Sequence, residues 1–259
     1  MNNKKIIKLV IILVISLIVI FFGYKGFMFY RYTIEKPDDV EDIVKGLKNQ
    51  STMNIKKNIL AENEYITIDK FKIKNVLDGY TEDENHSKHV RIFRKKVDNN
   101  ESIYQFTIDY YDIRIVDAFT KGVTIFGDSN IGFLKGDVNA ADGKDFLEKN
   151  NIKNDIDFYK FVADNYFIES NIFTDTKTLK QNYAFNLIAA ISVPKIDRWT
   201  ILEGDITGYI MLIGTKEDKT VWQISVLKND KWHHITTTDS RFKDEEFTKE
   251  FVGSLEINV

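Results

Sequence analysis

Four histidines, grouped in two pairs, are the residues of this chain best suited to acid–base or metal chemistry near neutral pH. His86 and His89 follow the acidic run Glu82-Asp83-Glu84. In a helix they would share one face and could hold a metal ion, whereas in an exposed loop they would form a solvated charged patch. No third ligand stands at a recognisable spacing, so the sequence favours the solvated patch.

The second pair, His233 and His234, could supply the base of a hydrolytic reaction. Adjacent residues of a strand point to opposite faces, so at most one of the two can enter a given site. A general base also needs a carboxylate to orient it, and the candidates are Asp239 and Asp205. We therefore name His233, His234 and Asp239 as candidate catalytic residues. The alternative for the histidines is packing beside Trp232 or exposure at the surface.

Residues 136–145 carry oxygen ligands close to the spacing of a calcium loop: Gly136-Asp137-Val138-Asn139-Ala140-Ala141-Asp142-Gly143-Lys144-Asp145. This segment resembles the calcium loops of the EF-hand and dockerin families, in which ligands at positions one, three and five precede a glycine at position six. Asp142 and Gly143 fit that pattern only after a one-residue insertion. The resemblance implies calcium as a cofactor at Asp137, Asn139 and Asp142, but the broken spacing favours a solvated acidic loop that caps the next helix. No other cofactor is predicted.

The common local signatures of enzymes are missing from the chain. There is no cysteine, and the serine-hydrolase elbow, the phosphate-binding glycine loop and the zinc-protease motif are all absent. These absences argue against an enzyme without excluding one. The cluster Asp109-Tyr110-Tyr111-Asp112 could line a carbohydrate or peptide groove, because tyrosines stack on apolar faces and carboxylates accept hydrogen bonds. Ordinary strand residues would show the same composition.

An apolar run at residues 6–24, interrupted only by Lys8 and Ser16, predicts a transmembrane helix. About 20 helical residues match the roughly 30 Å hydrocarbon core of a bilayer. A cleaved secretory signal is one alternative, although the bulky flank around Phe27 and Tyr30 lacks the small residues of a cleavage site. A buried helix of a soluble domain is another, and the nearly all-round apolar surface argues against it.

Charge leaves the orientation of this helix open, because three basic residues precede most of the run and three follow it: Lys4, Lys5, Lys8, Lys25, Arg31 and Lys36. Long domains after a single span translocate largely regardless of charge. We therefore expect a short cytoplasmic tail, a single pass through the cell membrane at residues 6–24, and an extracytoplasmic C-terminal region.

Beyond Lys36 the acidic residues outnumber the basic ones by eight. This region therefore lacks the clustered positive charge of a nucleic-acid binder. Nucleic acid is therefore not an expected partner. Only six of the 36 basic residues are arginine, a bias typical of bacterial proteins from genomes of low GC content.

Apolar periodicity predicts the elements that must position these residues. Helical spacing recurs at residues 40–47, 146–147, 158–166, 179–191 and 247–255. Alternation typical of strands recurs at residues 65–68, 71–73, 90–93, 103–108, 206–213, 221–227 and 232–238. The predicted fold class is α+β, in which an N-terminal transmembrane helix precedes a β-rich half and then a half of helices packed on an antiparallel sheet.

The predicted organisation has three regions. Residues 1–31 form the cytoplasmic tail and transmembrane anchor, residues 32–135 a juxtamembrane helix and β-rich region, and residues 136–259 an α+β region. The glycine-rich stretch 127–139 is the candidate linker, and the last two regions can equally form one domain.

These observations predict a single-pass membrane-anchored protein of a bacterial cell surface that serves binding, assembly or sensing, with a protein or cell-wall partner. One alternative is a membrane-anchored envelope hydrolase that uses the histidines and Asp239. Another is an immunity or inhibitor protein, which rests on the location and the acidic surface.

Overall fold

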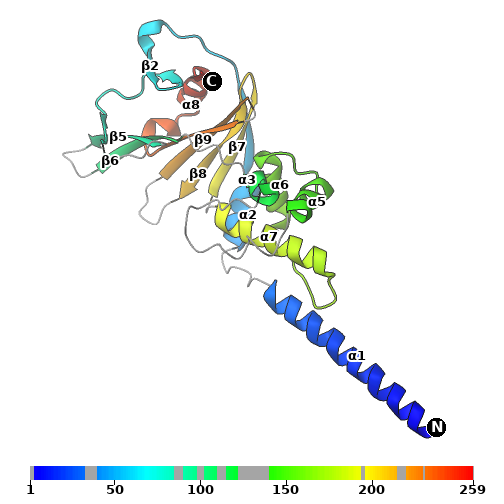
Figure 1. Cartoon of the computed structure of the whole chain (residues 1–259). Helices are drawn as coiled ribbons and strands as arrows, with labels where there is room; N and C mark the ends of the chain where they lie inside the picture. Colours follow the sequence, from blue (N-terminus) through cyan, green and yellow to red (C-terminus); the bar gives the residue numbers. More distant parts are fainter. Residues whose placement is uncertain are drawn as a thin grey trace.

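The chain folds as an α+β structure with an N-terminal apolar helix and a large sheet (Figure 1). A computed structural model describes residues 3–32, 40–84, 90–97, 102–109, 115–121, 140–193, 196–214, 220–229 and 231–258. The α-helices are α1 (Asn3–Arg31), α2 (Val40–Lys48), α3 (Ile115–Lys121), α5 (Ala140–Lys149), α6 (Asp155–Asn165), α7 (Thr176–Ser192) and α8 (Glu245–Gly253). The described residues also form the short 3-10 helices η1 (Glu62–Glu64) and η2 (Ser240–Lys243).

Within the described residues, the strands form one sheet of eight strands and one of three. The strands are β1 (Gln50–Ile55), β2 (Tyr65–Ile68), β3 (Phe71–Lys74), β4 (Thr81–Glu82), β5 (Val90–Val97), β6 (Ser102–Asp109), β7 (Ile196–Gly204), β8 (Thr207–Gly214), β9 (Thr220–Lys228), β10 (Lys231–Thr237) and β11 (Glu256–Ile257). The large sheet has the order β1-β7-β8-β9-β10-β6-β5-β4, and the small one β11-β3-β2.

The large sheet is an antiparallel meander of β7 to β10 that is extended on both sides by strands from earlier in the chain. β6 pairs antiparallel with β10, and β1 pairs parallel with β7. The sheet is therefore mixed. Its strands from residues 136–259 pair antiparallel with one another, as predicted, and the parallel pairing involves β1 from the earlier region. Strands from both the 32–135 and the 136–259 regions share its hydrogen-bond ladder.

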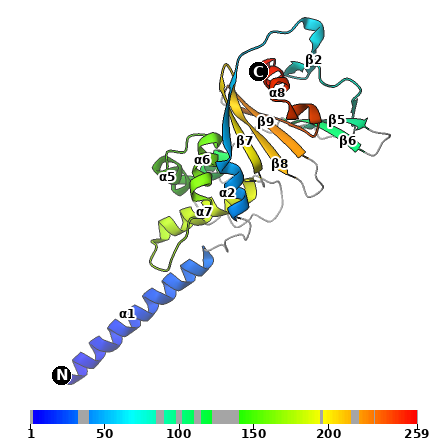
Figure 2. The same cartoon turned by 180° about the vertical axis from the view of Figure 1, so that it is seen from behind.

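One face of the large sheet is covered by a helical layer made of α2, α3, α5, α6 and α7 (Figures 1 and 2). The sheet contributes large buried aromatic side chains, among them Trp199, Tyr209 and Trp232. The helices meet them with a second aromatic group in which Phe185 packs against Phe146 with ring centroids 5.4 Å apart. Burial of this area supplies the main driving force for the helical layer.

The opposite face is covered by α8, η2 and the small sheet. Phe106 of β6 meets Phe251 of α8 edge to face, and Phe242 of η2 packs on the same ring. Trp222, Ile224 and Val226 alternate along β9 and all point to this face, as period-two spacing predicted. Two separate cores therefore share the strands of one sheet.

Polar residues at the helix starts fix where the helices begin. The side chains of Asn154, Asp175 and Asp244 accept hydrogen bonds from backbone N–H groups in the first turns of α6, α7 and α8. α7 ends at Ser192, two residues before Pro194, which cannot continue a helix.

Helix α1 projects from the domain and is long and apolar enough to be a candidate membrane span. Its side chains from Ile11 to Phe22 are largely exposed, so it is not a core helix of the domain. Its contacts with the rest of the described chain lie near its end, where Met28 of α1 and Tyr32, which follows the helix, are buried against Leu179 of α7. The Lys25 ammonium donates a hydrogen bond of 3.1 Å to the carbonyl of Thr174, just before α7.

Candidate functional site

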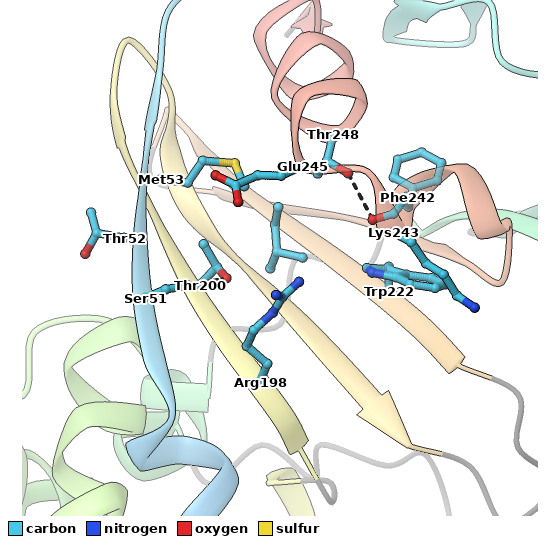
Figure 3. A pocket seen from close by; sticks show the side chains of 11 residues that line it. Ser51, Thr52, Met53, Arg198, Thr200, Trp222, Phe242, Lys243, Glu245 and Thr248 are labelled. Atoms are coloured by element: carbon cyan, nitrogen blue, oxygen red, sulfur yellow. Dashed lines mark hydrogen bonds between the residues drawn. The ribbon is translucent and has the colours of Figure 1, made fainter.

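A cavity of about 260 Å³ lies on the face of the large sheet opposite the helical layer, where η2 and α8 approach β1, β7, β8 and β9 (Figure 3). Its floor is made of strand side chains and its wall of side chains from the two helices. This cavity, called here the α8 pocket, is lined by Ser51, Thr52, Met53, Arg198, Thr200, Ile210, Trp222, Phe242, Lys243, Glu245 and Thr248.

Strand register places the floor residues of the α8 pocket in two rows. Arg198 of β7 and Trp222 of β9 both face Leu212 of β8, so they lie in one row two strands apart. Ser51 of β1 and Thr200 of β7 are direct neighbours in the next row, and their hydroxyl oxygens are 2.8 Å apart. Successive residues of a strand point to opposite faces, and this alternation brings the four side chains onto one surface.

The charge in the α8 pocket is positive. Within the described part of the chain, neither Arg198 nor Lys243 has a hydrogen-bond or ion-pair partner. The pocket's one carboxylate, that of Glu245, already pairs with Lys249 at 3.1 Å. Two uncompensated cations beside a neutralised acid favour the binding of an anion.

Trp222 adds a hydrogen-bond donor to the α8 pocket. Its side chain is only 3% exposed, and its indole N–H has no hydrogen-bond partner among the described residues. In Figure 3 the indole nitrogen lies on the side of the ring nearer Arg198. A buried donor without an acceptor costs roughly 1–3 kcal/mol, so an acceptor atom of a ligand would be stabilised at this position. Thr248 has no free donor, since its hydroxyl donates to the Phe242 carbonyl at 3.1 Å.

The candidate catalytic histidines point to opposite faces of β10. His234 lies with its Nδ1 atom 2.8 Å from the hydroxyl of Ser225, on the face covered by the helical layer. Ser225 is fully buried and also hydrogen-bonds the hydroxyl of Tyr209, which in turn hydrogen-bonds Tyr159. Burial raises the pKa of both tyrosines, so these hydroxyls stay protonated. A serine held in this core network cannot be reached by a substrate.

His233 and Asp239 belong to the other face. His233 is buried and packs edge to face on Phe71, with ring centroids 5.7 Å apart. Asp239 begins η2 and accepts hydrogen bonds from the Tyr80 hydroxyl at 2.8 Å and from the Arg241 guanidinium at 2.6 Å. Asp205, the other candidate acid, accepts from the Lys57 backbone N–H at 2.8 Å. The structure therefore does not bring His234 together with Asp239.

The environment of Asp239 favours its ionised form. Burial opposes ionisation, but the hydrogen bonds from Arg241 and Tyr80 outweigh burial and hold the pKa of the Asp239 carboxyl below its ordinary value. Burial and the hydrogen bond to Asp239 raise the pKa of the Tyr80 hydroxyl. Asp239 is thus an acceptor that ties η2 to the segment between β3 and β4.

Two of the candidate calcium ligands, Asp137 and Asn139, lie outside the described residues, as do His86, His89 and residues 110–112. The third, Asp142, lies in the first turn of α5, and its carbonyl accepts a hydrogen bond from Gln181. Gly143 is helical, and a Cβ there would lie 2.0 Å from the carbonyl oxygen of Phe119 in α3. Close helix packing therefore explains this glycine. No group of three or more candidate metal ligands occurs among the described residues, and calcium stays a hypothesis.

Sequence reasoning missed Arg198, Lys243 and the role of Trp222. The alternation of residue types in β7 does predict a strand there, with Arg198 and Thr200 on the face opposite Trp199. The pocket forms only where α8 packs on the sheet. No local sequence pattern predicts that position.

Comparison with protein-family models, with curated proteins and with solved structures found no match to this chain.

Proposed function

We propose that this chain is a single-pass membrane protein whose extracytoplasmic domain is a binding or sensing module, with the α8 pocket as the site for an anionic group. The observation that carries the proposal is the convergence of Arg198 and the buried Trp222 N–H on one cavity. The domain is anchored through α1, whose length and composition suit a membrane span.

The chemistry of the α8 pocket suits a carboxylate or a phosphate. A guanidinium can donate two parallel hydrogen bonds to either group, and the indole N–H supplies a third donor. One of the Ser51 and Thr200 hydroxyls donates to the other at 2.8 Å, so the accepting hydroxyl keeps its own proton for a ligand. These groups hold and orient an anion, which is the chemistry of a binding site.

Replacing Arg198 with glutamine is expected to weaken anion binding about tenfold to hundredfold, because a hydrogen bond from a charged donor contributes roughly 1.5–3 kcal/mol. Purified full-length protein in detergent is screened by thermal shift against inorganic phosphate, phosphate monoesters and dicarboxylates. Calorimetry then measures the affinity of the anion that gives the largest shift.

The matched control for this experiment is Lys153→Gln, which removes one exposed positive charge between α5 and α6, on the helical layer. Its affinity for the anion should equal that of the unchanged protein. Equal weakening in R198Q and K153Q would show that only net charge matters. A screen in which no anion raises the melting temperature would refute the proposed site.

The anchor makes a separate prediction: the full-length chain stays in the membrane pellet after alkaline extraction, and its N-terminus is intact by mass spectrometry. Protease added to cells without an outer wall should remove the domain and leave the α1 fragment, because the domain is proposed to lie outside. An N-terminus that begins after residue 24 would instead support a cleaved signal sequence. Protection of the domain from protease would reverse the orientation.

A further inference from the structure

The turn between α6 and α7 lies beside the end of the apolar helix. Lys25 is the first residue after the apolar run of α1, and its ammonium donates a hydrogen bond of 3.1 Å to the Thr174 carbonyl in this turn. The contact is supported by Tyr32, the residue after α1, whose ring packs edge to face on Tyr183 of α7 with ring centroids 5.7 Å apart. In both views of the fold, the connection between α6 and α7 lies at the end of the domain nearest α1 (Figures 1 and 2).

This turn presents a large apolar side chain to the outside. Phe173 is 75% exposed, although most phenylalanines of the described chain are buried. The turn is held by three hydrogen bonds around Asn171: its carbonyl accepts from Thr174 N–H at 3.0 Å, its side-chain oxygen accepts from Phe173 N–H at 2.9 Å, and its own N–H donates to the Thr174 hydroxyl at 3.0 Å. Phe173 is therefore fixed in its exposed position.

The neighbouring residues have the composition of a membrane interface. Phe27 and Tyr30 of α1 are also exposed, at 58% and 85%. The ammonium of Lys180 lies 5.5 Å from the centre of the Tyr32 ring. Aromatic side chains and lysines gather at the level of lipid headgroups, where rings meet the acyl boundary and ammonium groups meet phosphates.

We propose that the turn at residues 171–174 inserts Phe173 into the headgroup region of the bilayer beside α1. The domain is then held against the lipid at two points, by α1 and by Phe173. This inference rests on the proposed membrane span of α1, because the Lys25–Thr174 contact places the turn at the height where that span ends. The partner is the lipid surface itself.

Phe173→Trp tests the proposal in the full-length protein reconstituted into phosphatidylcholine–phosphatidylglycerol vesicles. The three native tryptophans are at most 3% exposed and give a constant background that the unchanged protein measures. Some of the lipid is brominated either near the glycerol or near the ends of the acyl chains. The new tryptophan should lose most of its added emission to bromine near the glycerol and much less to bromine near the chain ends.

Two further variants serve as controls. Ile59→Trp replaces an equally exposed residue, 79%, on the connection from β1 to β2, which lies at the end of the domain far from α1. It should show no quenching. Leu17→Trp, in the middle of the apolar run, should be quenched by the deep bromine.

The outcomes separate the two proposals. If Leu17→Trp is quenched at depth but Phe173→Trp behaves as Ile59→Trp does, the contact with lipid is refuted and the anchor stands. If Leu17→Trp is not quenched, the anchor is refuted and the docking of Phe173 falls with it.

Discussion

Phe185→Ala is expected to lower the free energy of unfolding by about 4 kcal/mol, because truncating a fully buried phenylalanine removes apolar contact and leaves a cavity. Phe185 is 0% exposed and stands at the centre of the helical layer. Its ring centroid lies 5.4 Å from that of Phe146 and 5.2 Å from that of Phe161. The rings that contact Phe185 come from two other helices, α5 and α6, and cannot all move inward together. Urea denaturation of the full-length protein in detergent, followed by tryptophan fluorescence, measures the change.

The matched control is Phe173→Ala, which makes the same chemical change at a side chain that is 75% exposed. We expect it to alter stability by less than about 0.5 kcal/mol. Similar losses in the two variants would contradict the packing described for the helical layer.

Asp239→Ala is expected to lower the free energy of unfolding by about 3 kcal/mol, because it breaks an ion pair whose carboxylate is buried. The Asp239 side chain is 2% exposed, whereas that of Arg241 is 42% exposed and can regain water. The loss should therefore fall at the low end of the range for buried pairs. The variant also leaves the Tyr80 hydroxyl without its acceptor. The comparison is Asp244→Ala, which removes only the cap of α8 and should cost about 1 kcal/mol.

The contribution of Asp239 depends on pH in a defined direction. The pKa of its carboxyl is lower in the folded protein than in the unfolded chain, because the hydrogen bonds from Arg241 and Tyr80 outweigh burial. The stabilisation is therefore complete above the unfolded pKa of about 4 and is lost as the pH falls through the lower folded pKa. Asp239→Asn should destabilise the protein at neutral pH, and the difference from the unchanged protein should shrink below about pH 4. A difference independent of pH would show that the carboxylate charge is not what stabilises η2.

Periodicity was sufficient to predict the elements that bury a regular stripe or face. This pattern predicts the helices α2, α6, α7 and α8 and the strands β8, β9 and β10, because apolar side chains recur along each of them and pack into one or both cores. These elements make up much of the two cores, and they explain why the α+β class could be predicted.

Other elements depend on partners far away in the sequence. β1 has the polar sequence Gln-Ser-Thr-Met-Asn-Ile and buries only Met53 and Ile55, so it becomes a strand through its pairing with β7. α3 contains Ile115, Val116 and Phe119, residue types that suit a strand as well as a helix. Its helical state follows from packing against α5 at Gly143, which overrides local propensity.

The candidate site was harder to predict for the same reason. Strand alternation correctly places His233 and His234 on opposite faces of β10. It does not show that Phe71 packs against His233 or that the Ser225 hydroxyl bonds His234. Arg198 and Trp222 meet only because β7, β8 and β9 pair in one register. A pocket formed across strands leaves no motif of fixed spacing in the chain.

The order of strands in the large sheet sets the order in which the protein can be completed during synthesis. Gln50 of β1 pairs with Trp199, and Asp109 of β6 pairs with His234. Each of these early strands therefore pairs with a strand that is synthesised more than a hundred residues later. Until β10 has emerged, the hairpin of β5 and β6 has no ladder that joins it to the meander. A nascent chain that ends before residue 237 therefore lacks part of the strand that joins β6 to β9, and the large sheet can be completed only after β10 has been made.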